Sequence, residues 1–193
     1  MGNTEPFARM TGTLSVYIAP NTGTAEAEPA VNATPAGGWV SLGPTDGDQT
    51  INHVGGLTYF FDNDHQGPVK SVRGEEQPWV GFSVVGLTLE NYARILDVVA
   101  DVTSAVGPPA TKKLPIKRGS MPAEYSLLLK GAANSPYGDF PGQIYIPKCV
   151  EGGEPVQTRS KTGSPALECE FHVIEDDDQT DGNEMGWITV QTA

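Results

Sequence analysis

The sequence predicts a mainly-β fold, a β-sandwich or barrel that carries one packed α-helix and long loops or arms. The 23 glycines and 16 prolines make up about a fifth of the 193 residues, against about 12% in average proteins, which favours turns over long helices. Short segments of alternating apolar and polar residues recur along the chain, and one segment has helical spacing. The length indicates one domain over residues 1–193, with a flexible arm over residues 1–10 and a flexible loop over residues 19–38.

Strands are expected where alternation is bounded by turn residues. Ten segments meet this condition: 11–18, 39–42, 57–61, 68–73, 76–86, 114–118, 125–130, 143–150, 167–174 and 186–190. In segment 167–174 the apolar side chains share one face, while Glu168, Glu170 and His172 share the other. Residues 43–47 are expected to form a turn and residues 62–67 an exposed hairpin tip, because both runs are rich in turn-forming residues.

Two stretches depart from this pattern. Apolar residues at positions 89, 92, 93, 96 and 100 have the spacing of one amphipathic helix. Thr88 is a suitable N-cap for this helix, and the sequence Gly107-Pro108-Pro109 prevents it from continuing further. Residues 19–38 contain almost no large apolar side chain, so they cannot drive burial. Loops of this length inside compact domains are usually functional or disordered, so this one requires an explanation.

Charge and cysteine content exclude several classes of protein. The formal net charge of −12 disfavours a protein that grips nucleic acid, although an acidic wall suits a passage along which nucleic acid slides. No apolar run approaches the roughly 20 residues of a membrane span, and the amino terminus does not resemble a secretory signal. Two cysteines are too few for a disulfide framework, which indicates synthesis in a reducing cytoplasm.

The polar clusters favour surfaces over chemistry. His172 with Glu168 and Glu170 is a conceivable metal site, but no second cluster completes four ligands, and the acidic run 175–184 fails the spacing of a calcium loop. Residues 112–118 hold four basic residues, which are better explained as the complement of an acidic interface. No nucleophile–base set or phosphate-binding loop is present, so we expect no enzyme, cofactor or metal site.

An ordered set of segments resembles a known family. The set comprises GWVSLG at 38–43, TDG at 45–47, QGPVK at 66–70, RGEE at 73–76, VGFSV at 80–84 and LTLEN at 87–91. This succession is similar to that of the tail tube, or major tail, proteins of long-tailed bacteriophages. The segments IYIPK at 144–148, 168–178 and 187–190 resemble the later strands of the family more loosely, and residues 19–38 depart from its pattern.

The resemblance implies a structural virion protein that is assembled in the cytoplasm of a bacterial host. Six copies would form a ring, and stacked rings would form the tail tube, whose acidic lumen passes viral DNA. Its other partners would be the tape-measure protein and the neck or terminator proteins, with no membrane partner. The alternatives are a tail terminator, which caps one ring without polymerising, or the tube of a contractile particle.

On this interpretation, the hairpin 57–73 reaches a neighbouring subunit or ring through its tip. The amino-terminal residues through Arg9 and the loop 19–38 would act as arms that become ordered only on assembly. The candidate interface residues are Asp62, Asp64, His65 and Gln66 at the tip, Lys70 and Arg73 behind it, and Arg9 in the amino-terminal arm. Lys70 and Arg73 are expected to pair with acidic groups such as Glu75 or Asp177 across subunits. A third hypothesis is a carbohydrate-binding β-sandwich, which requires Trp39, Trp79 and Trp187 to form one exposed patch.

Overall fold

The computed structural model describes residues 12–85, 87–158 and 165–192. One sheet contains nine strands: β1 (Ser15–Pro20), β2 (Val40–Gly43), β3 (Thr45–Asn52), β6 (Trp79–Val85), β9 (Glu124–Gly131), β10 (Gly142–Glu151), β11 (Val156–Thr158), β12 (Ala166–Val173) and β13 (Trp187–Val190). Two hairpins stand apart from it: β4 (Gly55–Phe60) with β5 (Lys70–Glu76), and β7 (Thr103–Ala105) with β8 (Thr111–Lys113). The helices are α1 (Leu89–Ile95) and the short 3-10 helix η1 (Val99–Asp101). The mainly-β prediction with one α-helix is confirmed.

The large sheet closes on itself through Pro44. Its strands are antiparallel neighbours in the order β2-β1-β9-β10-β12-β6-β3, so β2 and β3 lie at the two ends of the series. Only Pro44 separates these two strands in the chain, and its carbonyl accepts a hydrogen bond from the Val85 amide at the end of β6 (2.9 Å). The two ends of the series are therefore one bent piece of chain, and the sheet forms a barrel.

Alternation along the strands fills the barrel. The inward side chains of β6 and β12 are Val80, Phe82, Val84, Leu167, Cys169 and Phe171, all buried. The predicted division of residues 167–172 into an apolar and a polar face is confirmed. The rings of Phe82 and Phe171 stack with centroids 5.6 Å apart, which joins the two strands across the interior.

Helix α1 has the predicted cap but a different buried face. The Thr88 hydroxyl accepts a hydrogen bond from the Asn91 amide (3.2 Å), as an N-cap should. The helix ends at Ile95, because Leu96 caps it and Asp97 takes a positive φ of 57°. Its buried residues are Asn91, Ala93 and Ile95, whereas Leu89 is exposed. The expectation of a longer helix buried through positions 89, 96 and 100 is wrong, because the chain turns before that stripe is complete.

Several strand boundaries also differ from the expectation. Residues 43–47 are only partly a turn, since Thr45 already begins β3. No strand covers 114–118; the neighbouring strands β7 and β8 precede that segment. Residues 19 and 20 belong to β1 and so shorten the predicted loop, and β11 was not expected at all. Residues 1–10, predicted to be an arm, lie outside the described residues.

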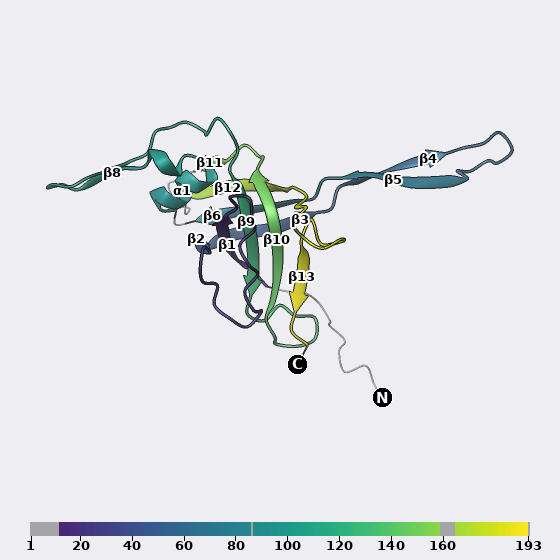
Figure 1. The fold of residues 1–193 in the computed structure, drawn as a ribbon, viewed down its shortest axis with the longest axis horizontal. Helices are drawn as coiled ribbons and strands as arrows, with labels where there is room; N and C mark the ends of the chain where they lie inside the picture. The colour runs from purple at the N-terminus through teal and green to yellow at the C-terminus, as the bar shows by residue number, and fades with distance from the viewer. Residues whose placement is uncertain (1–11, 86, 159–164, 193) are drawn as a thin grey trace.

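The two separate hairpins give the molecule its shape. In Figure 1 the β4–β5 hairpin extends far from one side of the barrel, while the β7–β8 hairpin extends from the opposite side. The β4–β5 hairpin leaves between β3 and β6, and the β7–β8 hairpin follows α1 and η1. The barrel therefore holds two arms that point in opposite directions.

The stacked rings in the barrel provide a test of where stability resides. We expect Phe171→Ala to lower the free energy of unfolding by about 3–5 kcal/mol, because it opens a cavity beside Phe82. Phe60→Ala on the β4–β5 hairpin is the matched control, with an expected change within about 0.5 kcal/mol, since Phe60 is 49% exposed. Urea denaturation of dilute protein, followed by circular dichroism, measures both. Equal losses for the two variants would contradict this account.

Candidate assembly surface

The β4–β5 hairpin is a two-stranded ribbon that no other described residue of the chain covers. Every residue of β4 and of β5 is exposed. Isolated two-stranded hairpins are marginally stable in water, and a third strand or a packed helix is normally needed to stabilise them. The described residues supply neither, so the hairpin presents an incomplete surface.

Both faces of this hairpin carry apolar side chains. Residues paired directly across the two strands point to the same side, and the pairs are Leu57 with Arg73, Thr58 with Val72, Tyr59 with Ser71 and Phe60 with Lys70. One face therefore holds Leu57 and Tyr59, and the other holds Phe60 and Val72. Each of these four side chains is between 43% and 51% exposed.

The predicted tip residues lie at the end of this hairpin. The carboxylate of Asp62 accepts hydrogen bonds from the amides of Asp64 (3.1 Å) and His65 (2.9 Å), which folds the tip into a compact turn. The Nδ1 atom of His65 lies 2.7 Å from the same carboxylate. The tip is accessible, because all four predicted residues are exposed: Asp62, Asp64, His65 and Gln66.

The two basic candidates lie on β5, away from the tip. Lys70 and Arg73 are both exposed, and Arg73 forms an ion pair of 3.5 Å with Glu76 of its own strand. That pair is with a different acid from the Glu75 or Asp177 named from the sequence, and pairing across subunits stays a prediction. Arg9 lies outside the described residues.

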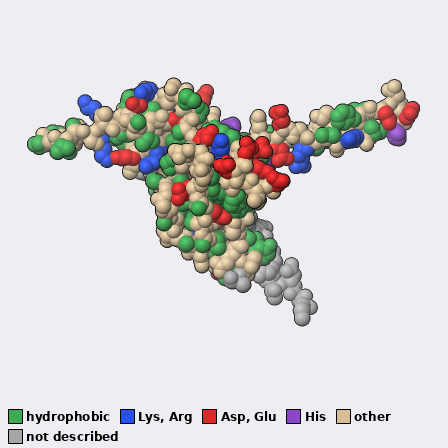
Figure 2. Space-filling view, in the orientation of Figure 1, with side chains coloured by type: hydrophobic (Ala, Val, Ile, Leu, Met, Phe, Trp, Pro, Cys, Tyr) green, Lys and Arg blue, Asp and Glu red, His purple; other side chains and the backbone are tan. Residues whose placement is uncertain are grey.

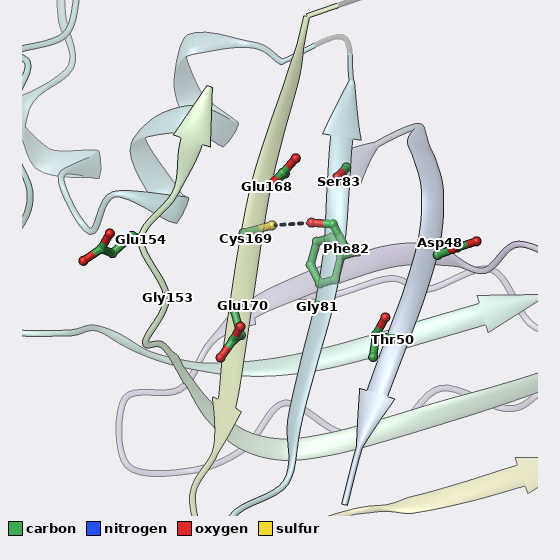
Figure 3. Close-up of a pocket in the computed structure, with 10 residues that line it drawn as sticks. All are labelled: Asp48, Thr50, Gly81, Phe82, Ser83, Gly153, Glu154, Glu168, Cys169 and Glu170. Carbon is green, nitrogen blue, oxygen red and sulfur yellow. Dashed lines mark hydrogen bonds between the residues drawn. The ribbon is translucent and has the colours of Figure 1, made fainter. Parts of the chain in front are cut away.

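A shallow acidic groove lies on the outside of the barrel. It has a volume of about 270 Å³ and runs over the outward faces of β3, β6 and β12 (Figure 3). Its charged lining residues are Asp48, Glu154, Glu168 and Glu170, without a lysine or arginine. This part of the barrel is therefore a negatively charged outer wall.

Residues 21–38 cross another outer face of the barrel as a strap. They lie over a second apolar cluster, made of Ala19, Trp39, Leu128 and Tyr145, against which Tyr17 and Trp187 pack. Tyr145 donates a hydrogen bond to the carbonyl of Glu26 (2.7 Å), and the Trp39 indole donates to the carbonyl of Ala27 (3.0 Å). The strap thus contacts its own sheet, whereas a role as an arm that becomes ordered on assembly stays a prediction.

Glu28 is the main side-chain anchor of the strap. Its carboxylate accepts hydrogen bonds from the Gln143 amide (2.6 Å), the Trp187 indole (2.9 Å) and the Thr189 hydroxyl (2.9 Å). Lys130 adds hydrogen bonds to the carbonyls of Ala30 (3.1 Å) and Ala33. Sequence reasoning missed this anchor, because one glutamate in a polar stretch gives no sign of three partners more than a hundred residues away.

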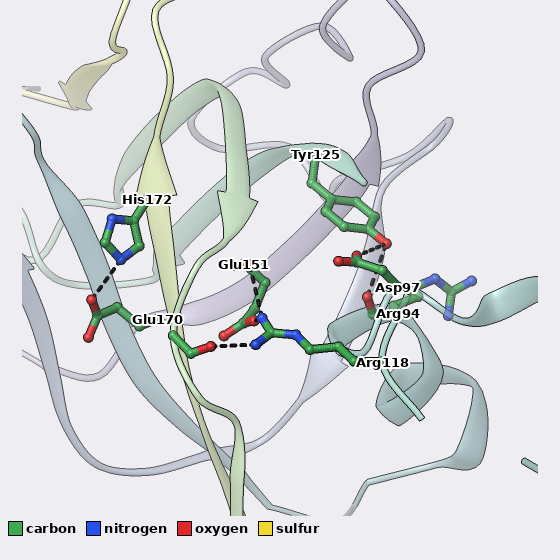
Figure 4. A network of polar contacts seen from close by, with 8 residues as sticks. Arg94, Asp97, Arg118, Tyr125, Glu151, Glu170 and His172 are labelled. Carbon is green, nitrogen blue, oxygen red and sulfur yellow. Dashed lines mark hydrogen bonds and ion pairs between the residues drawn. The ribbon is translucent and has the colours of Figure 1, made fainter. Parts of the chain in front are cut away.

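Polar contacts near α1 hold the base of the β7–β8 hairpin. Arg118, which follows that hairpin, contacts the buried carboxylate of Glu151 at the end of β10 and donates to the carbonyl of Gly153 (2.7 Å) (Figure 4). Lys112 on β8 forms an ion pair with Glu90 of α1. The β7–β8 hairpin is thereby tied both to the helix and to the barrel.

The buried Tyr125 and the half-buried Asp97 form a second polar contact near α1. The Tyr125 hydroxyl donates to the carbonyl of Arg94 (3.0 Å) and contacts the Asp97 carboxylate (3.2 Å). Burial raises the pKa of Asp97, an effect that hydrogen bonds from the Ala123 backbone and Tyr125 partly offset. Burial, together with the nearby Asp97 charge, also raises the pKa of Tyr125.

The cysteines and His172, which are the residue types that could act in catalysis or metal binding, are either buried or already in contact with a neighbouring side chain. Burial raises the pKa of the Cys169 thiol to about 12 and also that of Cys149, so neither thiol ionises readily. His172 contacts Glu170 through Nε2 (2.8 Å). Within the described ranges, no group of three histidine, cysteine, aspartate or glutamate side chains is arranged to hold a metal ion.

The sequence was compared with protein-family models and with curated proteins. No family model matches the chain, and no curated protein matches its sequence. No helix in the part of the chain that the structure describes has the length and apolar character needed to cross a membrane.

The pKa shift of Asp97 predicts a pH-dependent effect of its removal. The raised folded-state pKa means that the charged carboxylate destabilises the fold, and this cost disappears as the pH falls through that pKa towards the unfolded value. We expect Asp97→Asn to be at least as stable as the wild type at pH 7, because asparagine also tolerates the positive φ, and the difference to shrink at pH 4.

Urea denaturation at the two pH values measures this difference, with the exposed Asp178→Asn as the control variant. A loss of more than about 1 kcal/mol in Asp97→Asn at pH 7 would show that the hydrogen bonds of the carboxylate outweigh its burial.

Proposed function

We propose that this chain is the structural subunit of a bacteriophage tail tube, in which six copies form a ring and rings stack around a channel for viral DNA. The observation that carries the proposal is the β4–β5 hairpin, whose two apolar faces are both exposed. The sequence resemblance to tail tube proteins supports it independently. The virion tail as location, and tape-measure and neck or terminator proteins as partners, follow from the same proposal.

The hairpin exposes apolar side chains that do not stabilise an isolated monomer. Six large apolar side chains of the hairpin and its tip are 43–68% exposed: Leu57, Tyr59, Phe60, Phe61, Val69 and Val72. Burial of such surface contributes about 25 cal/mol for each Å² removed from water, and contiguous apolar patches commonly mark interfaces. A second copy of the chain supplies that cover in a head-to-tail contact, which closes into a ring when the rotation between copies allows it.

The acidic outer wall of the barrel suits the lining of a DNA channel. Asp48, Glu168 and Glu170 lie on the outward faces of β3 and β12, without a basic residue in the groove between them. In a tube, these carboxylates would repel the phosphates of passing DNA and prevent adhesion. The net charge of −12 is consistent with this role.

The tryptophan positions support a carbohydrate-binding module less well. Trp39 is buried and Trp187 donates its indole proton to Glu28, and both rings pack around Tyr145 beneath the strap. Trp79 belongs to β6 instead. The described residues therefore lack a platform of three exposed indoles on which a sugar would stack.

The hairpin contact can be removed without disturbing the barrel. We expect wild-type protein to form rings or hollow tubes in negative-stain electron microscopy at sufficient concentration. The Leu57→Ser/Tyr59→Ser variant should need about 10–100 times more protein to assemble, because partial burial of two such side chains contributes roughly 1.5–3 kcal/mol. Light scattering across a concentration series measures the threshold.

The control replaces two equally exposed apolar residues outside the hairpin, in Tyr137→Ser/Val156→Ser. An equal effect of both double variants would remove the argument from the hairpin. Rings that never stack would instead favour a tail terminator. A wild-type monomer that remains monomeric when concentrated and binds a polysaccharide would overturn the tube proposal.

A further inference from the structure

An apolar pocket opens beside the base of the β4–β5 hairpin. It has a volume of about 200 Å³ and lies between β3, β6, β10 and β13. Its main lining side chains are Ile51, Val80, Ile144, Val173, Trp187 and Ile188. Val80 and Ile144 belong to the barrel core, whereas Ile51 is 36% and Ile188 is 53% exposed. The pocket is therefore a place where the core is accessible from the surface.

The size and lining of the pocket fit a side chain better than a small molecule. Sites for drug-sized ligands usually start at about 300 Å³ and contain several converging polar groups. Here the titratable lining residues are His53, Glu76 and Tyr145. Glu76 already pairs with Arg73, and the Tyr145 hydroxyl already donates to the carbonyl of Glu26. One or two apolar side chains from a protein partner would fill such a space.

An acidic turn adjoins the pocket. Val173 and Met185, which both line the pocket, flank a turn that carries six carboxylates: Glu175, Asp176, Asp177, Asp178, Asp181 and Glu184. No lysine or arginine lies between residues 174 and 186. Figure 2 shows acidic side chains gathered where the long hairpin leaves the barrel. The expected partner is an apolar tip with positive charge behind it.

The β7–β8 hairpin has these properties. Val106 at its tip is fully exposed and is followed by Gly107, Pro108 and Pro109. Lys112 and Lys113 lie on β8 behind the tip, and residues 102–113 contain no acidic residue. The contacts of Lys112 with Glu90 and of Arg118 with Glu151 fix the direction of the hairpin.

The tip and the pocket lie on opposite sides of the molecule. The β7–β8 hairpin extends from the side with α1, while the pocket adjoins the base of the β4–β5 hairpin on the other side (Figure 1). The tip cannot reach the pocket of its own chain. It can reach the same pocket on a second copy that is placed head to tail.

We propose that the β7–β8 hairpin of one copy inserts Val106 into the pocket beside Trp187 of the next copy, with Lys113 facing the acidic turn 174–186. This contact rests on the proposed self-assembly and adds a second interface to that of the β4–β5 hairpin. Burial of Val106 and of the exposed parts of Ile51 and Ile188 supplies the apolar contribution. The charges orient the approach and make it sensitive to salt.

Disulfide cross-linking between two different single-cysteine variants tests this contact. Val106→Cys protein is mixed with Ile188→Cys protein under mild oxidation, and the heterodimer is quantified on a non-reducing gel. The matched control is Val106→Cys with Val156→Cys, since Val156 is 52% and Ile188 is 53% exposed. The native Cys149 and Cys169 are buried, and wild-type protein measures their background.

We expect at least about ten times more heterodimer from the pocket pair than from the control pair, because the contact raises the local thiol concentration. Lys113→Glu in the Val106→Cys chain leaves the Lys112–Glu90 ion pair in place and should reduce the yield. Salt at about 1 M, where the Debye length falls to about 3 Å, should also reduce it. Met185→Cys, on the same pocket, gives a second position if Ile188→Cys does not fold.

The outcomes separate this contact from the proposed function. Equal yields from the pocket and control pairs would overturn the contact, even if the wild type forms tubes. A strong, salt-sensitive pocket cross-link without rings or tubes would support the contact and count against the tail tube. Cross-linking that the Lys113→Glu change leaves unaltered would overturn the electrostatic part of the proposal.

Discussion

Closure of the barrel through Pro44 is the constraint on which the rest of the fold depends. Because β2 and β3 are one bent piece of chain, β1 and β6 are held at a fixed separation on either side of it. Alternate side chains of every barrel strand must then point inwards, so most of the large buried residues pack together in one core inside the barrel. Proline suits the corner, because a ladder amide would have no partner where the strand changes neighbours.

The outer layer of the molecule depends on β10 in the same way. On one side, the first half of β10 pairs with β13 and its second half with β12. On the other side β10 pairs with β9, and that register is irregular between Ile146 and Cys149. Ile144 and Ile146 therefore face the barrel core, while Gln143 and Tyr145 face the strap. One strand thus supports two layers, and the carboxylate of Glu28 joins the strap to both β10 and β13.

Local sequence patterns were sufficient to predict elements whose apolar and polar residues alternate according to which side chains are buried. Strands β6 and β12, the Thr88 cap and the hairpin tip were all identified from neighbouring residues. Strand β3 was missed because its sequence, TDGDQTIN, has no apolar alternation and is held by pairing with β6. Segment 114–118 alternates like a strand but finds no ladder partner, so its pattern was misleading.

The candidate surfaces were predictable only in part, for a related reason. A polar run such as 62–67 predicts exposure from composition alone, and the tip is indeed exposed. The pocket beside Trp187 brings together residues from six strands, spread between positions 51 and 188, and no short-range pattern in the sequence indicates such a contact. The ion pairs expected across subunits involve a second chain, whose position the sequence of one chain does not define.

The position of β6 has a mechanical consequence. The chain runs from the β4–β5 hairpin directly into β6, and from β6 through α1 to the β7–β8 hairpin. A pull that separates the two arms is therefore transmitted along β6, which is hydrogen-bonded to β3 on one side and to β12 on the other. Antiparallel ladder bonds lie perpendicular to the strands, so they share such a load in shear and do not open one after another. Strand β6 is therefore the part of this path that is best placed to resist extension between the two arms.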